Sequence, residues 1–368
     1  MNTVKGNIKF TGEDQKEFFQ VLRHRVDQYF IDNNISKYAN GLMVFKTIVL
    51  TLMYFVPFYF ILFTELSIGI QMVCWTIMGI GLAGIGMSIM HDANHGAYTS
   101  NKTLNTLLSH SLNLLGGSVF NWKLQHNILH HTYTNVVEYD EDIADKLILR
   151  MSPHTEVKGV HRFQFIYAFL FYGIITIYWA LAKDFIQFHR YTKNGVNPQN
   201  KQQNRITLAK IIVTKVFYFS YTLGLPILVL GLPWLPVIAG FLLMHFFAGM
   251  ILTVIFQLAH TVEGTQHPLP SDLGTIENSW AVHQLCTTVD FARKNKLLSF
   301  YIGGLNFQVE HHLFPRICHV HYPQLAPIVK ETAHEFGIPY MENETFMEAL
   351  RSHIRTLQRF GHVEIELA

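Results

Sequence analysis

The sequence has little charge and few cysteines for its length. Only 15% of its 368 residues are Asp, Glu, Lys or Arg, against about 25% in an ordinary soluble domain. Together with 49% hydrophobic residues, this composition predicts a membrane protein. A formal net charge of +2, without any long basic run, argues against nucleic acid as a partner. The three cysteines, Cys74, Cys286 and Cys318, form no CxxC pair and indicate neither a disulfide framework nor a thiolate metal site.

Long apolar runs are present instead, and four of them are expected to cross a bilayer. They lie near residues 47–64, 68–90, 211–231 and 233–259, each close to the roughly 20 residues that a spanning helix needs. The connections at 65–67 and around 230–236 contain no Lys or Arg, which is typical of tight turns on the non-cytoplasmic side. The spans are therefore predicted to form two hairpins.

A fifth apolar run, residues 163–182, is flanked by basic residues on both sides. Six Lys or Arg lie between residues 96 and 162, and six lie between residues 183 and 210. The positive-inside rule places both flanks in the cytoplasm. We therefore expect 163–182 to lie in the interface or to dip into the cytoplasmic leaflet without crossing, with its Tyr and Trp residues at the headgroup level.

The predicted fold class is an all-α integral membrane protein with four transmembrane helices, one interfacial helix and a cytosolic helical cap. The expected divisions are a cytosolic N-terminal segment (1–40), a membrane domain (41–330) and a cytosolic C-terminal tail (331–368). The N-terminal residues carry several Lys and Arg before any apolar run, unlike a signal peptide. Both termini are expected in the cytoplasm.

The 21 histidines are unevenly placed, and three groups have the spacing of metal ligands. HDANH contains His91 and His95, HNILHH contains His126, His130 and His131, and QVEHH contains Gln308, His311 and His312. On an α-helix, residues three or four apart share a face, whereas His131 would be turned onto the flank of its helix. The four-span topology places all three groups on the cytoplasmic side, so we expect them to converge there.

Other histidines have simpler explanations, with one exception. His260, at the point where the last span leaves the bilayer, is a further ligand candidate, although neither its direct ligation nor that of Gln308 is decided by the sequence. His245 is expected to make a polar contact within the bundle, and His319 and His321 to support the third group locally; His283 could have either role. Eight further histidines, which we expect to be solvated or hydrogen-bonded, are His24, His110, His154, His161, His189, His334, His353 and His362.

The number of candidate ligands favours two metals. Imidazole suits Zn, Cu, Fe and Ni, but a single zinc needs only about four ligands. HExxH is absent, which argues against a zinc protease. A carboxylate-bridged di-iron site needs Glu-x-x-His twice, and the sequence has it once, from Glu331 to His334. The remaining hypothesis is a histidine-rich non-haem centre of two Fe that activates oxygen against unactivated C–H bonds, with a hydrocarbon chain as substrate.

These motifs resemble the HxxxH, HxxxHH and (H/Q)xxHH pattern of the integral-membrane fatty acid desaturases. The stretch NFQVEHHLFPRICHVHYP, with Gln308 in place of the first histidine of the third motif, is similar to the front-end and linoleoyl-CoA desaturase branch. The resemblance covers roughly residues 40 to 330. It implies a membrane stem under a cytosolic cap that holds two irons over an acyl tunnel, and it supports His260 as a ligand.

The resemblance also implies the reaction and the partners. A cis double bond would be introduced with O2 into a fatty acyl chain that arrives as acyl-CoA, on an acyl carrier or in an acyl lipid. Many front-end desaturases of eukaryotes carry a fused cytochrome b5 domain with an HPGG motif, whereas this sequence has only HPLP at 267–270. A separate electron donor, such as ferredoxin or cytochrome b5, and a bacterial inner membrane are therefore expected.

Three alternatives remain open from the sequence. A hydroxylase would use the same oxidant and return oxygen to the carbon. A metal transporter would need ionisable residues along its spans, which offer little beyond His245 and Lys215, and a bis-histidine haem protein would need ligands that face each other inside the bundle. The polar residues Asp92, Asn94, Asp140 and Glu310 are candidates for holding the ligating imidazoles, or could be solvated residues of the cap.

Overall fold

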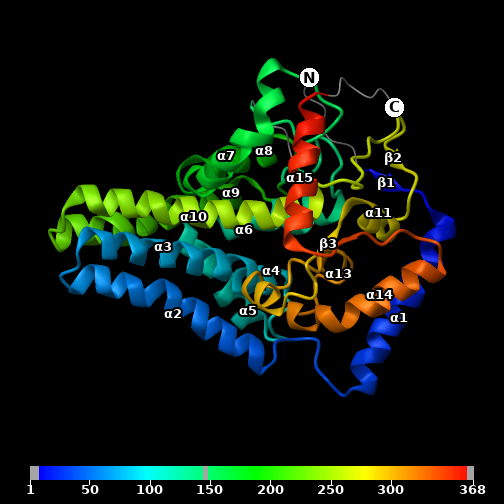
Figure 1. Ribbon diagram of the computed structural model, residues 1–368, viewed down its shortest axis with the longest axis horizontal. Helices are drawn as coiled ribbons and strands as arrows, with labels where there is room; N and C mark the ends of the chain where they lie inside the picture. Colours follow the sequence, from blue (N-terminus) through cyan, green and yellow to red (C-terminus); the bar gives the residue numbers. More distant parts are fainter. Residues whose placement is uncertain (1–7, 144–147, 363–368) are drawn as a thin grey trace.

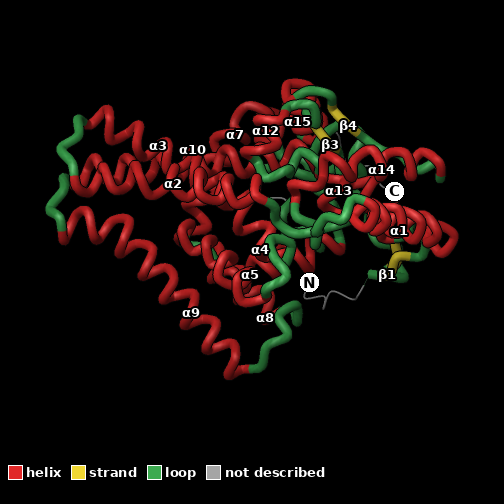
Figure 2. Tube along the Cα trace, turned by 90° about the horizontal axis from the view of Figure 1, so that it is seen from below, coloured by secondary structure: helices red, strands yellow, loops and turns green. Residues whose placement is uncertain are grey.

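Long helices form a stem at one end of the molecule, and the shorter elements form a cap at the other end (Figure 1). The computed structural model describes residues 8–143 and 148–362. The stem consists of α2 (Gly41–Phe63), α3 (Ile68–Gly84), α9 (Lys201–Phe219) and α10 (Trp234–His260). Its helices are joined at the end far from the cap by the turns at 64–67 and 230–233. In the perpendicular view, α2, α3 and α10 stay together while α9 diverges from them (Figure 2).

Two stem helices continue through π-helical segments. Helix α3 passes through η2 (Ile85–Met90) into α4 (His91–His95), and α9 passes into η7 (Ser220–Val229). The described residues contain five helices that are long and apolar enough to cross a membrane by length and composition: Gly41–Phe63, Ile68–His95, Gly159–Lys193, Lys201–Val229 and Trp234–His260. Four of the five overlap the four predicted spans.

The fifth long helix contains the predicted interfacial segment and is longer than expected. It runs without a break through η5 (Gly159–Phe163), α7 (Gln164–Tyr178), η6 (Trp179–Lys183) and α8 (Asp184–Lys193). Near its start, Gln164 donates to the carbonyl oxygen of Leu357 at 2.8 Å, and near its end Gln187 donates to Gln125 at 2.5 Å. Both partners belong to the cap, so the two ends of this helix contact the same end of the molecule.

Helices α3 and α10 pack closely because small residues lie between them. A Cβ atom at Gly79 would lie 2.4 Å from the carbonyl oxygen of Met244, and one at Gly240 would lie 1.9 Å from the Trp75 indole. Trp75 is fully buried. Small residues at such contacts let two apolar helices approach each other and gain dispersion energy, as is usual between membrane helices.

The cap is built around two helices from opposite ends of the chain. Helix α1 (Lys16–Asp32) packs on α14 (Tyr322–Glu335), with Leu22 and Val26 buried in the same apolar cluster as Leu325 and Val329. The other short helices among the described residues are η1 (Glu13–Gln15), α5 (Lys102–Ser109), η3 (His110–Leu115), α6 (Val119–Trp122), η4 (Lys123–His130), α11 (Trp280–Thr287), α12 (Lys296–Tyr301), α13 (Gln308–Leu313), η8 (His319–His321) and α15 (Phe346–Phe360).

The described residues include two pairs of very short strands beside the helices. Strand β1 (Lys9–Phe10) pairs in parallel with β2 (Thr275–Ile276), and β3 (Asp290–Phe291) pairs in parallel with β4 (Glu342–Asn343). Two-residue strands leave no alternating pattern in a sequence, so they were not expected in an all-α fold. The fold is mostly helical, as predicted. Helix α14 runs across residue 330, where the membrane domain was expected to end; that division stays a prediction.

We predict that Gly240→Ala lowers the melting temperature of the detergent-purified protein by several degrees. The added methyl group would overlap the fully buried Trp75, and overpacking of this kind costs about 1–3 kcal/mol. The matched control is Gly69→Ala in α3, where a Cβ atom meets nothing within 4 Å. Equal melting temperatures for the two variants would contradict the tight α3–α10 contact.

Candidate metal centre

All nine predicted site residues lie together where the stem meets the cap. They come from four segments: α4 at the end of the α3 helix, η4 with the residue after it, the last residue of α10, and α13. The side chains are buried, except that His95 is partly exposed. The structure therefore brings into one place His91, His95, His126, His130, His131, His260, Gln308, His311 and His312.

The imidazoles form adjoining groups. One nitrogen from each of His91, His95, His126 and His311 lies within 4.8 Å of the others, and the same holds for His130, His260 and His312. His131 lies between the two groups, within the same distance of both His311 and His312. Gln308 joins the second group through its Nε2 atom, which is 2.8 Å from Nε2 of His260.

The position of His131 differs from the prediction because the second motif is π-helical. In η4 the backbone hydrogen bonds join residues five apart, so residues i and i+5 come onto one face. His126 and His131 consequently meet, with their Nε2 atoms 3.3 Å apart. The prediction that His131 lies on the flank was wrong, because it assumed α-helical spacing. A second π segment, η2, directly precedes His91.

Hydrogen bonds hold several of these imidazoles by their Nδ1 atoms. Nδ1 of His130 lies 2.9 Å from the Asp140 carboxylate, and Nδ1 of His312 lies 2.7 Å from the Gln284 amide oxygen. Nδ1 of His311 lies 3.3 Å from the Tyr322 hydroxyl. The Nε2 atoms of all three histidines are buried and have no hydrogen-bond partner among the described residues. Each ring is therefore oriented on one side and has a free nitrogen on the other.

Electrostatics keep most of the cluster uncharged. Burial, followed by the repulsion of neighbouring imidazoles, lowers the pKa of His131, His311 and His312 well below the usual value. Burial likewise lowers the pKa of His126 to about 3. His130 differs: burial lowers its pKa, but the Asp140 carboxylate outweighs that effect and raises it. Neutral imidazoles have the lone pair that a metal ion requires.

The spacing of the nitrogens fits metal coordination. With metal–nitrogen bonds of about 2.1 Å, two ligands at right angles lie about 3.0 Å apart. The Nε2 atoms of His91 and His126 are 3.2 Å apart, which is close to that value. An N–H···N hydrogen bond between the two rings has the same spacing, and a metal ion that binds both nitrogens would take the place of that proton. The donor set of eight imidazoles and one amide is large enough for two metals.

A comparison with protein families decides which kind of metalloprotein this is. The family model of fatty acid desaturases matches residues 67–344, a range that contains all nine clustered side chains. The chain belongs to the fatty acid desaturase family. It is therefore an oxygen-dependent oxidoreductase that desaturates fatty acyl chains, and it is an integral membrane protein of a metal-dependent family. The transporter and haem alternatives are set aside.

Individual relatives are similar to the desaturase over almost its whole length. It is 36% identical to the sn-1 linoleoyl-lipid 6-desaturase of Synechocystis sp., over 96% of this chain and 98% of that protein. It is 34% identical to the protein of the same name from Arthrospira platensis, over 94% and 92% of the two chains. It is also 32% identical to the acyl-lipid (8-3)-desaturase of Physcomitrium patens, over 99% of this chain and 75% of that protein. These relatives agree with the predicted front-end branch.

The Asp92 carboxylate has a different role from a metal ligand. Its Oδ2 atom lies 2.8 Å from Nδ1 of His319, whose Nε2 atom lies 2.6 Å from the ammonium group of Lys46. Asp92, Cys318 and His319 are close enough together to hold a metal, but the nearby ammonium repels a cation and both His319 nitrogens are engaged. His319 thus supports the first motif, whereas it was expected to support the third. The predicted first span begins near residue 47 and does not include Lys46, which is buried in α2.

The Glu310 carboxyl, between Val309 and His311, is fully buried on the other side of α13. Burial and the nearby Asp290 carboxylate raise its pKa well above the usual value. Asp290 accepts the backbone N–H of Val309 at 3.0 Å and the Tyr340 hydroxyl at 2.6 Å. Asp290 therefore fixes the start of the helix that carries the third motif.

Of the predicted supporting residues, Asp140 contacts a clustered imidazole directly, and Asn94 has no side-chain hydrogen bond in the part of the chain described.

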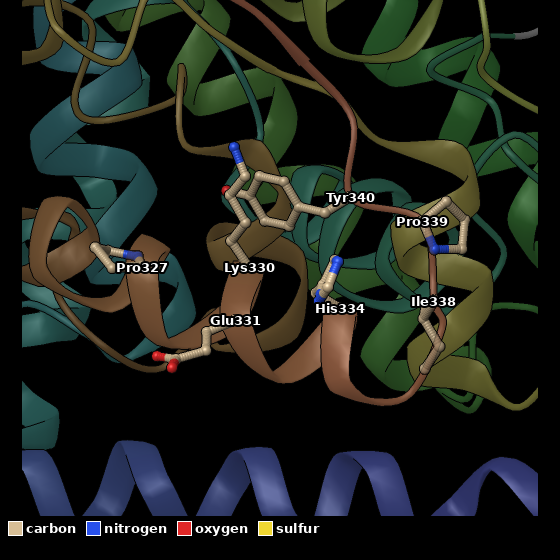
Figure 3. A pocket seen from close by; sticks show the side chains of 7 residues that line it. All are labelled: Pro327, Lys330, Glu331, His334, Ile338, Pro339 and Tyr340. Atoms are coloured by element: carbon tan, nitrogen blue, oxygen red, sulfur yellow. The ribbon is translucent and has the colours of Figure 1, made fainter.

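The single Glu-x-x-His pair lies outside the cluster. Glu331 and His334 line a surface pocket on α14 together with Lys330 and Tyr340 (Figure 3). A carboxylate-bridged site is therefore not built from these residues. His245 makes the polar contact expected of it within the bundle, with Nε2 2.6 Å from the Tyr218 hydroxyl.

Sequence reasoning missed the amide that holds His312. Gln284 is fully buried on α11, and its oxygen also accepts a hydrogen bond from the Thr134 hydroxyl at 2.8 Å. Thr134 follows the second motif, so this one amide links the second and third motifs. Neither its residue type nor its distance from the motifs marks Gln284 in the sequence. Only the packing of α11 against α13 reveals it.

We predict that Gln284→Ala lowers the bound metal per protein and reduces turnover about 10–100-fold, the usual loss when an orienting partner of a metal ligand is removed. Without the acceptor, the His312 ring is free to rotate. Gln284→Glu keeps an acceptor oxygen and should retain metal. Metal content by mass spectrometry of the purified protein is the measurement, with the exposed Gln202→Ala as the control. Wild-type metal content in Gln284→Ala would show that the amide does not hold His312 in place.

Proposed function

We propose that the clustered side chains hold two iron ions and that the enzyme forms a cis double bond in the acyl chain of a membrane lipid. The observation that carries this proposal is the pair of adjoining groups of buried imidazoles. Because the two groups adjoin, two metals bound there would lie close enough to act on one O2 molecule. Eight imidazoles make up most of the donor set, and the nearby Asp142 carboxylate approaches His126 and His130 at their Nδ1 atoms, which favours a centre of the histidine-rich type.

Iron bound here would supply the activation of O2 that is needed to remove hydrogen from unactivated methylene groups. Two electrons and two protons from outside, with the two hydrogens of the substrate, reduce one O2 to two waters. The protein's own part is to position the acyl chain and to exclude water from the site. The Trp122 ring, only 8% exposed, lies 4.5 Å from the His126 ring and covers that side of the cluster. Asp140 and Gln284 hold their imidazoles in fixed orientations.

Gln308 is proposed to contribute its amide oxygen to the second group. Its amide lies 2.8 Å from Nε2 of His260, the nitrogen that would face a metal. The oxygen and nitrogen of an amide exchange places by a simple rotation of the side chain. The oxygen would then face the metal bound by His130, His260 and His312.

The substrate is proposed to be an acyl lipid that is desaturated near its carboxyl end. The support comes from the two cyanobacterial relatives, whose names give a linoleoyl lipid as substrate and position 6 as the site. Both are similar to this chain over more than nine-tenths of its length. Electrons are proposed to come from a separate donor, such as ferredoxin or cytochrome b5.

The proposed topology has four spans, with the cap and both termini in the cytoplasm of a bacterial inner membrane. Helix Gly159–Lys193 would lie along the cytoplasmic face. Its contacts support this placement, because Gln164 and Gln187 near its two ends both bond to the cap. Its middle dips into the stem, where the Thr176 hydroxyl donates to the carbonyl oxygen of His245, in the middle of α10, at 2.8 Å. A helix that crossed the bilayer would have one end far from the cap.

We predict that expression in a bacterial host that supplies a reduced donor produces a new double bond in the host lipids. Gas chromatography of the fatty acid methyl esters gives its position. His312→Ala should abolish the product while the protein remains inserted, because it removes a proposed iron ligand from a helix held by its surroundings. His24→Ala, at an exposed position on α1, is the matched control. Product formation by His312→Ala would remove this residue from the ligand set.

We predict that cysteines near Asn105 and Asn197 are labelled from the same side of the membrane. Lys102→Cys and Gln202→Cys, both at exposed positions, are introduced singly into a variant without native cysteines. Glu65→Cys, in the exposed turn between α2 and α3, should be labelled only from the opposite side. Labelling of Lys102→Cys and Gln202→Cys from opposite sides would mean that Gly159–Lys193 crosses the bilayer.

A further inference from the structure

A second pocket lies where the chain enters the stem, between the loop before α2 and the start of α14. Its volume is about 340 Å³, within the range of small-ligand sites. The polar residues that line it are Tyr29, Ser36, Tyr38, Asn40, His321 and Gln324. Neither the proposed iron site nor the reaction uses this pocket.

The pocket lies at the depth of lipid headgroups. Asn40 caps the N-terminus of α2, accepting the backbone N–H of Met43. Apolar side chains are exposed immediately after it, as at Leu42 (51%) and Phe45 (58%). Helix α2 therefore enters the hydrocarbon region within one turn of the pocket. Tyr29 and Tyr38 fit this position, because tyrosine is enriched where a membrane protein meets the headgroups.

The lining chemistry favours an uncharged ligand that bears hydroxyl groups. None of the lining residues is Asp, Glu, Lys or Arg. The His321 ring donates to the carbonyl oxygen of Tyr38 at 2.9 Å, which fixes the wall of the pocket. The Tyr29 hydroxyl, the Tyr38 hydroxyl and the Gln324 amide have no hydrogen-bond partner among the described residues. Phenols and an amide can both donate to and accept from a sugar hydroxyl, whereas no Lys or Arg among the lining residues is available to pair with a phosphate.

The pocket is connected to the metal centre through its own walls. The backbone N–H of Ala39 donates to the carbonyl oxygen of Tyr98, just beyond the first motif, at 3.0 Å. On the other side, His319 directly precedes the lining residue Val320 and contacts the Asp92 carboxylate at 2.8 Å, and Asp92 follows the clustered His91. These contacts fix the pocket walls relative to the first motif, so a ligand bound in the pocket would lie at a defined position with respect to that motif.

Desaturation near the carboxyl end requires a headgroup site close to the metals. At about 1.2 Å per bond in an extended chain, the carbonyl carbon lies roughly 6 Å from the sixth carbon. The headgroup begins only a few bonds further. An enzyme that acts at this position cannot leave the headgroup far away in the bilayer, so a headgroup site beside the first motif is expected.

We propose that this pocket binds the uncharged, hydroxyl-bearing headgroup of the acyl-lipid substrate, such as the sugar of a glycosyl diacylglycerol. The proposal rests on the proposed function, since it assumes a lipid substrate desaturated near its carboxyl end. It assigns headgroup recognition to the loop before α2 and to the start of α14. The Tyr38 hydroxyl and the Gln324 amide then select the lipid class.

The test is the binding of monoglucosyl diacylglycerol and of phosphatidylglycerol to the purified full-length protein, measured by native mass spectrometry. Tyr38→Phe should weaken the glucosyl lipid about fivefold, the effect of about 1 kcal/mol for one hydrogen bond. Gln324→Ala should weaken it by a similar factor, and the double variant by about 25-fold if the two effects add. Phosphatidylglycerol should bind less tightly than the glucosyl lipid and should be unaffected by these changes.

Tyr59→Phe is the matched control, because it removes a phenol from an exposed position on α2, away from the pocket. The proposal is overturned if the Tyr38 and Gln324 variants bind the glucosyl lipid as tightly as the wild type does. It is also overturned if phosphatidylglycerol binds as tightly as the glucosyl lipid and loses the same affinity in these variants. Fatty acid analysis of the same preparations separates the two proposals. A new double bond near the carboxyl end with unchanged lipid binding rejects only the headgroup site, whereas its absence in the wild type rejects the proposed function itself.

Discussion

Imidazole nitrogens that face one another at 3.2–3.3 Å in a buried site are the contact on which the rest of the structure depends. At this distance the nitrogens are joined either by an N–H···N hydrogen bond or by a shared metal ion, and buried polar atoms without partners cost free energy. The fold must therefore hold them in place before a metal binds. It does so with stem helices whose close packing fixes where α4 and the end of α10 lie. The glycines at positions 79 and 240 make that packing possible.

Orientation of the rings is a separate task, and it is carried out by residues from elsewhere in the chain. His130 is held by a carboxylate and His312 by an amide, although both belong to the same group of imidazoles. The carboxylate raises the basicity of its imidazole more than the amide does. Asp290 acts on the backbone instead of on a ring: it accepts the N–H of Val309 at the start of α13, and the Tyr340 hydroxyl donates to Asp290. The metal centre thus draws on α11 and on the β3–β4 pair as well as on the three motifs.

The cap also explains how a membrane enzyme could treat the two ends of its substrate differently. The acyl chain is apolar and suits the stem, whereas a headgroup needs polar contacts at the bilayer surface. The loop before α2 joins these environments, since it touches the region after the first motif on one side and η8 on the other. A lipid held there would present its first carbons to the metals. The similarity to lipid desaturases that act at position 6 agrees with this arrangement.

The sequence by itself determined the membrane class, the long apolar helices and the membership of the clustered residues. Apolar length and histidine spacing are local properties, and they can be read without knowing how the segments pack. The tertiary structure decided the rest. His131 joined its neighbours through a π-helical turn that α-helical spacing could not predict, and His319 turned toward Asp92 instead of the third motif. Gln284, Lys46 and the headgroup pocket depend on contacts between segments far apart in the chain, which leave no pattern in either segment alone.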